Sequence, residues 1–134
     1  MRSHERFNWA AQILNIKSGD CILEIGCGVG LAIEAITPFL KKGKITAIDR
    51  SAAMISKANQ RNQEAIGEGK ARIFNTEFLA FSDRTIKYDK IFCFNINLFW
   101  TQKSIMKEAA ILKSLLEKRG LLYVFYGANG GQWF

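Results

Sequence analysis

A chain of 134 residues, 49% of them hydrophobic and 23% charged, has the size and composition of one compact folded domain. Its apolar runs are too short or too interrupted to cross a bilayer, and the N-terminus lacks the apolar block of a secretory signal. We therefore expect a cytoplasmic protein without a membrane segment. Cys21, Cys27 and Cys93 are scattered without CxxC spacing, which disfavours a disulfide framework or a metal site and favours reduced, buried thiols.

The formal net charge of +7 would suit an anionic partner such as nucleic acid. The lysines, however, stand at helix ends and on polar helix faces, as in "FLKKGK", and no block of Lys or Arg alternates with aromatic residues. A nucleic-acid partner stays open on this evidence but is not favoured.

Apolar runs typical of buried strands alternate along the chain with segments of helical periodicity. The predicted helices and strands, in chain order, are a helix over 6–16, a strand over 21–25, a helix over 31–40 that kinks or ends early at Pro38, a strand over 44–49, a helix from the N-cap Ser51 to about Gly67, strands over 71–75 and 90–95, a helix over 105–116 and a strand over 121–126. Strands that read as unbroken apolar runs between helices indicate a parallel sheet covered on both faces. The fold class is therefore α/β, with a doubly wound, mostly parallel sheet of about five strands flanked by helices.

The first predicted strand contains a carboxylate, Glu24, and runs into three glycines at alternate positions, Gly26, Gly28 and Gly30. In doubly wound sheets, ligands bind beyond the carboxyl ends of the strands. A glycine loop at that place lets the backbone approach a ligand closely and aims free N–H groups at it. Asp49 ends the next strand, 19 positions after Gly30, where a carboxylate can accept hydrogen bonds from both hydroxyls of a ribose. The pattern predicts a site for a nucleoside-containing cofactor, with tight turns and a helix-capping Asp as the purely structural alternative.

The glycine register separates two classes of cofactor. The dinucleotide fingerprint is GxGxxG, and Leu31 occupies the position of its third glycine, which weakens the case for NAD or NADP and an oxidoreductase. Pyrophosphate binding also needs no carboxylate ahead of the loop, whereas Glu24 can help to hold a ligand that bears an ammonium group. A cofactor with a cationic amino-acid portion fits these residues better.

Two stretches, "LEIGCGVG" and "AIDRSAAMISKA", resemble the first two motifs of class I S-adenosylmethionine-dependent methyltransferases, and "YDKIFCFNINLFW" is similar to the fourth-strand segment of that family. The resemblance covers about residues 7–126 and implies a Rossmann-like sheet with S-adenosylmethionine as the cofactor. It also implies that the glycine loop cradles the methionine portion of the cofactor and that Glu24 supports this loop.

The same resemblance implies further cofactor contacts. Asp49 would bind the ribose, and Arg50 and Met54 would lie near the adenine. Thr76 or Glu77 would lie near the adenine too, although the family often has Asp at that position. This departure leaves the adenine contact the least defined part of the predicted site.

No motif identifies the methyl acceptor. Asn95 follows the fourth predicted strand, where it would orient the methionine end or the acceptor, with a turn as the structural alternative. Family members that methylate amino groups often carry an Asn/Asp-Pro-Pro-aromatic signature there, and "NINLFW" lacks both prolines. No catalytic residue is assigned, because in-line methyl transfer depends mainly on positioning two reactants and excluding water. We favour a small-molecule acceptor.

Members of the methyltransferase family that this sequence resembles continue beyond the fifth strand with a helix and two further strands. We expect residues 1–134 to form a single methyltransferase domain that lacks these last two strands. The strand over 121–126 would then be a bare sheet edge, which natural proteins rarely leave open, so either the domain is truncated or a homodimer pairs these edges. A domain that binds the cofactor without a complete acceptor site is the alternative to an active enzyme.

Overall fold

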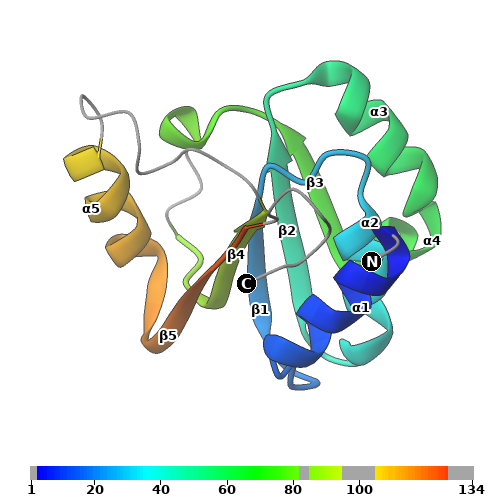
Figure 1. The fold of residues 1–134 in the computed structure, drawn as a ribbon, viewed down its shortest axis with the longest axis horizontal. Helices are drawn as coiled ribbons and strands as arrows, with labels where there is room; N and C mark the ends of the chain where they lie inside the picture. Colours follow the sequence, from blue (N-terminus) through cyan, green and yellow to red (C-terminus); the bar gives the residue numbers. More distant parts are fainter. Residues whose placement is uncertain (1–2, 82–84, 95–104, 127–134) are drawn as a thin grey trace.

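The computed structural model describes residues 3–81, 85–94 and 105–126. Five strands form one sheet in the order β3-β2-β1-β4-β5, and every neighbouring pair is parallel. Helices α1 to α4 lie on one side of the sheet and α5 lies on the other, giving three layers (Figure 1). The predicted α/β, doubly wound class is confirmed. None of the helices in these ranges is long and apolar enough to cross a membrane.

Three of the five strands match their predicted bounds, and the last two begin earlier than predicted. The strands are β1 (Cys21–Ile25), β2 (Lys44–Asp49), β3 (Ala71–Asn75), β4 (Tyr88–Phe94) and β5 (Leu116–Phe125). The first three match their predicted bounds. β4 begins earlier than predicted because Tyr88, which is fully buried, already pairs with Leu116. β5 begins before the predicted position 121 because its first part is an exposed polar edge, which does not read as an apolar run.

The helices differ from the prediction in the bounds of α1 and in a break at Asn62. They are α1 (Ser3–Ile13), α2 (Leu31–Ile36), the 3₁₀ turn η1 (Thr37–Phe39), α3 (Ala52–Arg61), α4 (Gln63–Gly67), the 3₁₀ turn η2 (Phe78–Ala80) and α5 (Ile105–Leu115). The early end at Pro38 is confirmed, and Ser51 caps α3 by accepting the Met54 N–H at 3.3 Å. α1 lies three residues before the predicted 6–16, and Asn15 adopts a left-handed φ of 49° after it. The single helix predicted from Ser51 to Gly67 is wrong, because Asn62 leaves the helical conformation at φ −110° and ψ 25°.

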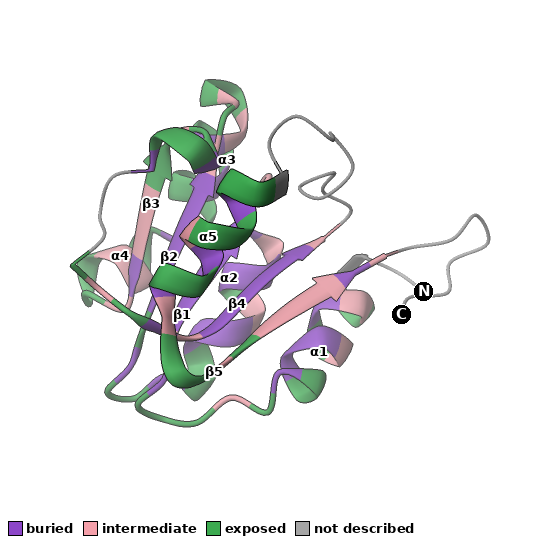
Figure 2. Ribbon diagram, turned by 90° about the vertical axis from the view of Figure 1, so that its left-hand side faces the viewer, coloured by how far each residue is buried: buried purple, intermediate pink, exposed green. Residues whose placement is uncertain are grey.

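One apolar cluster fills the space on each side of the sheet. On one face, α1, α2 and α3 pack with residues such as Leu14, Ile33 and Ala58. On the other face, η2 and α5 contribute Phe78 and Leu112. Figure 2 shows that β1, β2 and β4 are largely buried. Burial of a large aliphatic or aromatic side chain contributes about 1.5 to 3 kcal/mol, so both helix layers stabilise the central strands that end at the glycine loop.

β5 is one of the two outer strands, and within the described residues it pairs only with β4. Leu122 and Val124 pack on the α5 side, and Tyr123 and Phe125 pack on the α1 side. Residues 121–125 of this strand are therefore apolar on both faces, as predicted, and the bare sheet edge stays a prediction. Leu121 stays 55% exposed on this strand.

A buried ion pair ties the loop before β1 to β4. Lys90, which is 9% exposed, donates from Nζ to the Asp20 carboxylate and, at 2.8 Å, to the carbonyl oxygen of Asn15. The Lys17 N–H donates to the same carboxylate at 2.8 Å. Both buried charges thus have partners, which is the condition under which a buried pair is tolerated.

Removal of one member of this buried ion pair should destabilise the domain. We expect Lys90→Met to lower the free energy of unfolding by about 3 to 5 kcal/mol, because it leaves the Asp20 carboxylate buried without its cation. Urea denaturation measures this change. The double variant Asp20→Asn/Lys90→Met is the control and should lie closer to wild type than the single variant. A loss below about 1 kcal/mol in Lys90→Met would contradict this reading of the pair.

Candidate functional site

The loop between β1 and α2 follows a left-handed backbone path at three positions. Gly26, Gly28 and Gly30 have φ values of 77°, 55° and 84°. Residues with a Cβ rarely adopt these angles, so glycine is needed here by the path of the backbone itself. The alternating glycines therefore have a structural cause, and a role in ligand binding needs evidence of its own.

The loop is held by hydrogen bonds to β2. The N–H groups of Gly26 and Cys27 both donate to the carbonyl oxygen of Ile48, at 2.8 and 2.9 Å. The Gly28 N–H donates to Oδ2 of Asp49 at 2.9 Å. The prediction that the loop aims free N–H groups at a ligand is wrong for these three, because the end of β2 already accepts their hydrogens. These bonds fix the path of the loop against the end of β2.

Two of the glycines have different surroundings. A Cβ added to Gly28 would meet no atom of the described residues within 4 Å, so within this part of the chain the loop is open on that side. A Cβ added to Gly30 would lie 2.6 Å from Nδ2 of Asn62 and 3.1 Å from Cα of Ala58, so Gly30 is needed for close packing against α3. Gly28 is thus the position at which a ligand can approach the backbone closely.

Asp49 lies at the carboxyl end of β2 and is half-buried. Its Oδ2 accepts the Gly28 N–H, and its Oδ1 accepts the Ser51 N–H at 2.8 Å. An ionised carboxylate has about four acceptor positions, so about two remain for hydroxyl donors. The Asn75 side-chain amide and the Thr76 N–H both donate to the Asp49 carbonyl oxygen at 3.0 Å. These bonds tie the end of β3 to the end of β2.

The remaining predicted contacts follow β2 and β3 at the same edge of the sheet. Arg50 is exposed, and Met54 is half-buried in the first turn of α3. Thr76 is half-buried and Glu77 is exposed just before η2. Because parallel strands end together, the sheet brings these four residues to the side where the glycine loop lies. Asn95 lies outside the described residues.

Glu24 is buried in β1 at 2% exposure, and its Oε1 has no hydrogen-bond partner among the described residues. Burial raises the pKa of the Glu24 carboxyl well above its ordinary value, and the nearby Asp49 carboxylate raises it further. Burial of a polar atom without a partner is unfavourable. A cationic group near Oε1 would offset both causes of the raised pKa.

The thiols beside Glu24 are not nucleophiles. Cys27 and Cys93 are buried, as predicted, whereas Cys21 is half-buried. Burial, followed by the nearby Glu24 carboxyl, raises the pKa of the Cys27 thiol, and the same causes raise the pKa of Cys93 to about 12. Because the thiolate is the reactive form, neither cysteine is suited to covalent catalysis at neutral pH.

Two residues at the end of α3 contact the loop and were missed by the sequence prediction. Arg61 donates from Nε to the carbonyl oxygen of Val29 at 3.2 Å, and Asn62 donates from Nδ2 to that of Gly30 at 3.1 Å. The one available signal was a short polar residue in the middle of an otherwise helical pattern, because Asn favours backbone hydrogen bonds over helix interiors.

Comparison with known proteins places this geometry in a family. The family model described as "Methyltransferase domain" matches residues 22–120, which is more than half of the chain. The chain belongs to this methyltransferase family. The predicted resemblance is therefore confirmed, and the match includes β1, the glycine loop and Asp49.

The domain also resembles individual methyltransferases. It is 29% identical over 119 residues to "Putative methyltransferase YrhH" of Bacillus subtilis (strain 168), covering 89% of this chain and 64% of that protein. It is 31% identical over 106 residues to the chloroplastic magnesium protoporphyrin IX methyltransferase of Arabidopsis thaliana, covering 78% of this chain and 32% of that protein. The chain spans less than two thirds of the length of these relatives.

Solved structures of methyltransferases share the fold. The plantazolicin methyltransferase BpumL in complex with SAH matches with a TM-score of 0.69 and 28% identity, over 93% of this chain and 46% of that one. The magnesium protoporphyrin IX methyltransferase ChlM from Synechocystis PCC 6803, with bound SAM, matches with a TM-score of 0.70 over 97% of this chain and 60% of that one. At 17% identity, the ChlM match bears on the fold alone.

The raised pKa of Glu24 predicts a pH-dependent effect of its replacement. The folded protein keeps the Glu24 proton at pH values where the unfolded chain, with an ordinary pKa near 4.5, has lost it. Stability contributed by this proton is therefore lost as pH rises through the folded-state pKa. In the ligand-free protein, we expect the free energy of unfolding of wild type to fall relative to that of Glu24→Gln as pH rises above about 4.5.

Urea denaturation at several pH values between 4 and 8 measures this trend. Glu64→Gln, which changes an exposed glutamate on α4, is the matched control. A difference between Glu24→Gln and wild type that is constant with pH would contradict the raised pKa.

Proposed function

We propose that this domain binds S-adenosylmethionine at the glycine loop and transfers its methyl group to an acceptor. The observation that carries the proposal is the bond between the Gly28 N–H and Asp49. Among the described residues, it joins the open side of the loop to a carboxylate that accepts only two hydrogen bonds. The family match and the SAH complex of BpumL support the same cofactor.

The residues present fit the chemical groups of this cofactor. The open side of Gly28 leaves room for the methionine portion, and Glu24 offers a buried carboxyl to its ammonium group. The remaining acceptor positions of Asp49 suit the two ribose hydroxyls. Arg50 and Met54 would hold the adenine from α3 and the segment that precedes it.

Thr76 and Glu77 would contact the adenine from the end of β3, and Asn95 would orient the methionine end or the acceptor. When bound, S-adenosylmethionine supplies an electrophilic methyl group on a sulfonium. The protein contributes by fixing the cofactor and excluding water, since in-line transfer needs no covalent nucleophile. This agrees with the raised thiol pKa values of Cys27 and Cys93.

A nicotinamide-dependent oxidoreductase is the weaker alternative. The position of the third glycine in the dinucleotide fingerprint holds Leu31, the first residue of α2, which packs against the apolar cluster on the α1 side of the sheet. A domain that binds the cofactor without turnover is the second alternative. Formation of SAH from S-adenosylmethionine in the presence of a panel of amine, thiol, phenol and carboxylate acceptors separates it from an active enzyme.

The acceptor in our proposal is a small molecule, as the name of the magnesium protoporphyrin IX methyltransferase of Arabidopsis thaliana indicates for that relative. Nucleic acid is not favoured, because no basic block interleaved with aromatic residues occurs in the sequence. We place the protein in the cytoplasm, where buried free thiols such as Cys27 and Cys93 stay reduced. We also propose that the chain forms one domain, because all described strands belong to a single sheet.

The placement of the ribose predicts the effect of Asp49→Ala. A hydrogen bond to a charged acceptor contributes about 1.5 to 3 kcal/mol, so SAH affinity should fall about tenfold or more. Isothermal titration calorimetry with SAH, S-adenosylmethionine and NAD tests both the cofactor and the residue. Asp89→Ala is the matched control, because the Asp89 carboxylate accepts a backbone N–H, from Cys21 at 2.8 Å, near the opposite ends of the strands.

Binding of NAD in preference to SAH would contradict the proposed cofactor. SAH binding that is equal in wild type and Asp49→Ala would contradict the ribose placement alone. Asp89→Ala should bind SAH as wild type does.

We also propose that two copies pair through the outer edge of β5. The edge has no strand partner among the described residues, and Leu121 is 55% exposed on it. We expect light scattering to report a dimer for wild type and weaker association for Leu121→Lys, because a lysine on an edge opposes pairing. Leu79→Lys, on the 45% exposed Leu79 of η2, is the control. A monomer mass for wild type at about 100 μM protein would contradict the pairing.

A further inference from the structure

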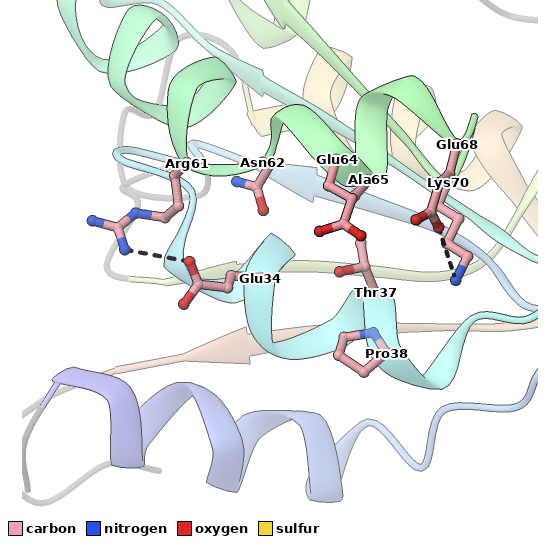
Figure 3. Close-up of a pocket in the computed structure, with 9 residues that line it drawn as sticks. All are labelled: Glu34, Thr37, Pro38, Arg61, Asn62, Glu64, Ala65, Glu68 and Lys70. Atoms are coloured by element: carbon pink, nitrogen blue, oxygen red, sulfur yellow. Dashed lines mark hydrogen bonds and ion pairs between the residues drawn. The ribbon is translucent and has the colours of Figure 1, made fainter.

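The last residue of α3 and the residue after it contact successive carbonyl groups of the glycine loop. Arg61 Nε donates to the Val29 carbonyl oxygen at 3.2 Å, and Asn62 Nδ2 donates to the Gly30 carbonyl oxygen at 3.1 Å. Figure 3 shows both side chains extending from the α3–α4 junction toward α2. They approach the loop from the side of α3, whereas an added Cβ on Gly28 would have no neighbour within 4 Å in the part of the chain that the structure describes.

Asn62 has the stricter geometry of the two. It is 4% exposed, and its Nδ2 donates both to the Gly30 carbonyl oxygen and to the Ala58 carbonyl oxygen at 3.0 Å. A side chain that closes the end of its own helix thus also binds a loop 32 residues earlier in the chain. The fit is close, because any Cβ on Gly30 would come within 2.6 Å of Nδ2.

The loop is therefore held from two directions. β2 accepts the N–H groups of Gly26, Cys27 and Gly28, and α3 donates to the carbonyl groups of the next two residues. Glycine has the largest backbone freedom of any residue, so a loop with three left-handed glycines needs such contacts to stay in one conformation. If only a fraction of molecules has the binding conformation, the apparent affinity falls by that fraction.

We propose that Asn62 and Arg61 are positioning residues that hold the glycine loop in its cofactor-binding conformation before the cofactor arrives. The inference rests on the proposed function, since it concerns the affinity of that same site. Neither residue needs to touch the cofactor. They act on it through the loop, by lowering the conformational cost of binding.

The groove beside Arg61 and Asn62 limits the loss of cofactor affinity that truncating either side chain can cause. Arg61 and Asn62 line a polar groove of about 230 Å³ between α2 and the α3–α4 pair, where Arg61 also forms an ion pair with Glu34 at 3.4 Å. Water in this groove can replace part of a truncated side chain as a donor. We therefore expect a moderate loss of affinity.

The first measurement is the SAH affinity of Asn62→Ala by calorimetry. We expect binding about three- to tenfold weaker than in wild type, as for the loss of one buried neutral hydrogen bond. Asn62→Asp, of nearly the same shape, should lose more, because it places an acceptor against two carbonyl oxygens. Asn59→Ala, an exposed Asn on the same helix, and Glu34→Gln, which weakens the ion pair without touching the loop, are the controls and should bind SAH as wild type does.

Hydrogen exchange distinguishes a local role in holding the loop from a general effect on stability. The N–H groups of Gly26, Cys27, Gly28 and Gly30 each donate within the protein, so their exchange reports opening of the loop. In ligand-free Asn62→Ala, these four amides should exchange faster than in wild type while the amides of β3 stay unchanged. General destabilisation would instead lower the melting temperature without this local pattern.

The outcomes separate the inference from the proposed function. Equal SAH affinity and equal loop exchange in Asn62→Ala and wild type would overturn the positioning role and leave the cofactor assignment intact. Absence of SAH binding in wild type would overturn the proposed function, and exchange in the ligand-free variants would still decide whether the loop is held from α3. If Asn62→Ala does not fold, Arg61→Met, which lacks the donor to Val29, takes its place with an expected loss of about two- to threefold.

Discussion

The hydrogen bond from the Gly28 N–H to the Asp49 carboxylate is the contact on which the site depends, because it fixes a flexible loop on the end of a buried strand. The bonds from Gly26 and Cys27 to Ile48 act in the same direction. β2 is held between β1 and β3, so these acceptors have little freedom. The glycine loop takes its shape from these bonds to the sheet. This is the condition under which most of the binding free energy remains available for affinity.

Two buried carboxyl groups at the sheet show how a structural group differs from a candidate binding group. Asp20 is held by Lys90 and by the Lys17 N–H, so its burial is compensated within the protein. Glu24, in contrast, has an oxygen without a partner among the described residues and a pKa that burial raises well above the ordinary range. A packed apolar residue in its place would stabilise the domain. This unpartnered oxygen among the described residues distinguishes Glu24 from Asp20, and in our proposal the ammonium group of the cofactor lies against it.

The sequence alone predicted the parts whose signal is local. β1 and β2 are largely buried, so they read as apolar runs and end next to Gly or at a polar residue. β3, a partly exposed edge strand, still carries a short apolar run that ends at Asn75. The start of β5 was missed because an exposed edge strand is polar there and carries no periodic signal. Glu24, the glycines and Asp49 were found from their spacing. Asn62 was not, because its partner lies 32 residues away and helical periodicity contains no information about a side chain that binds a distant loop.

The alternating glycines combine two requirements that the sequence cannot separate. All three φ values demand glycine or a strained substitute, so the backbone path explains the pattern without any ligand. Gly30 has a second reason, because Asn62 and Ala58 leave no space for a Cβ. Gly28 has no such neighbour within 4 Å among the residues described, and its N–H donates to Asp49. The surroundings of Gly28 thus leave room for a cofactor within the described part of the chain. The close contacts of Gly30 instead show how tightly the loop packs against α3.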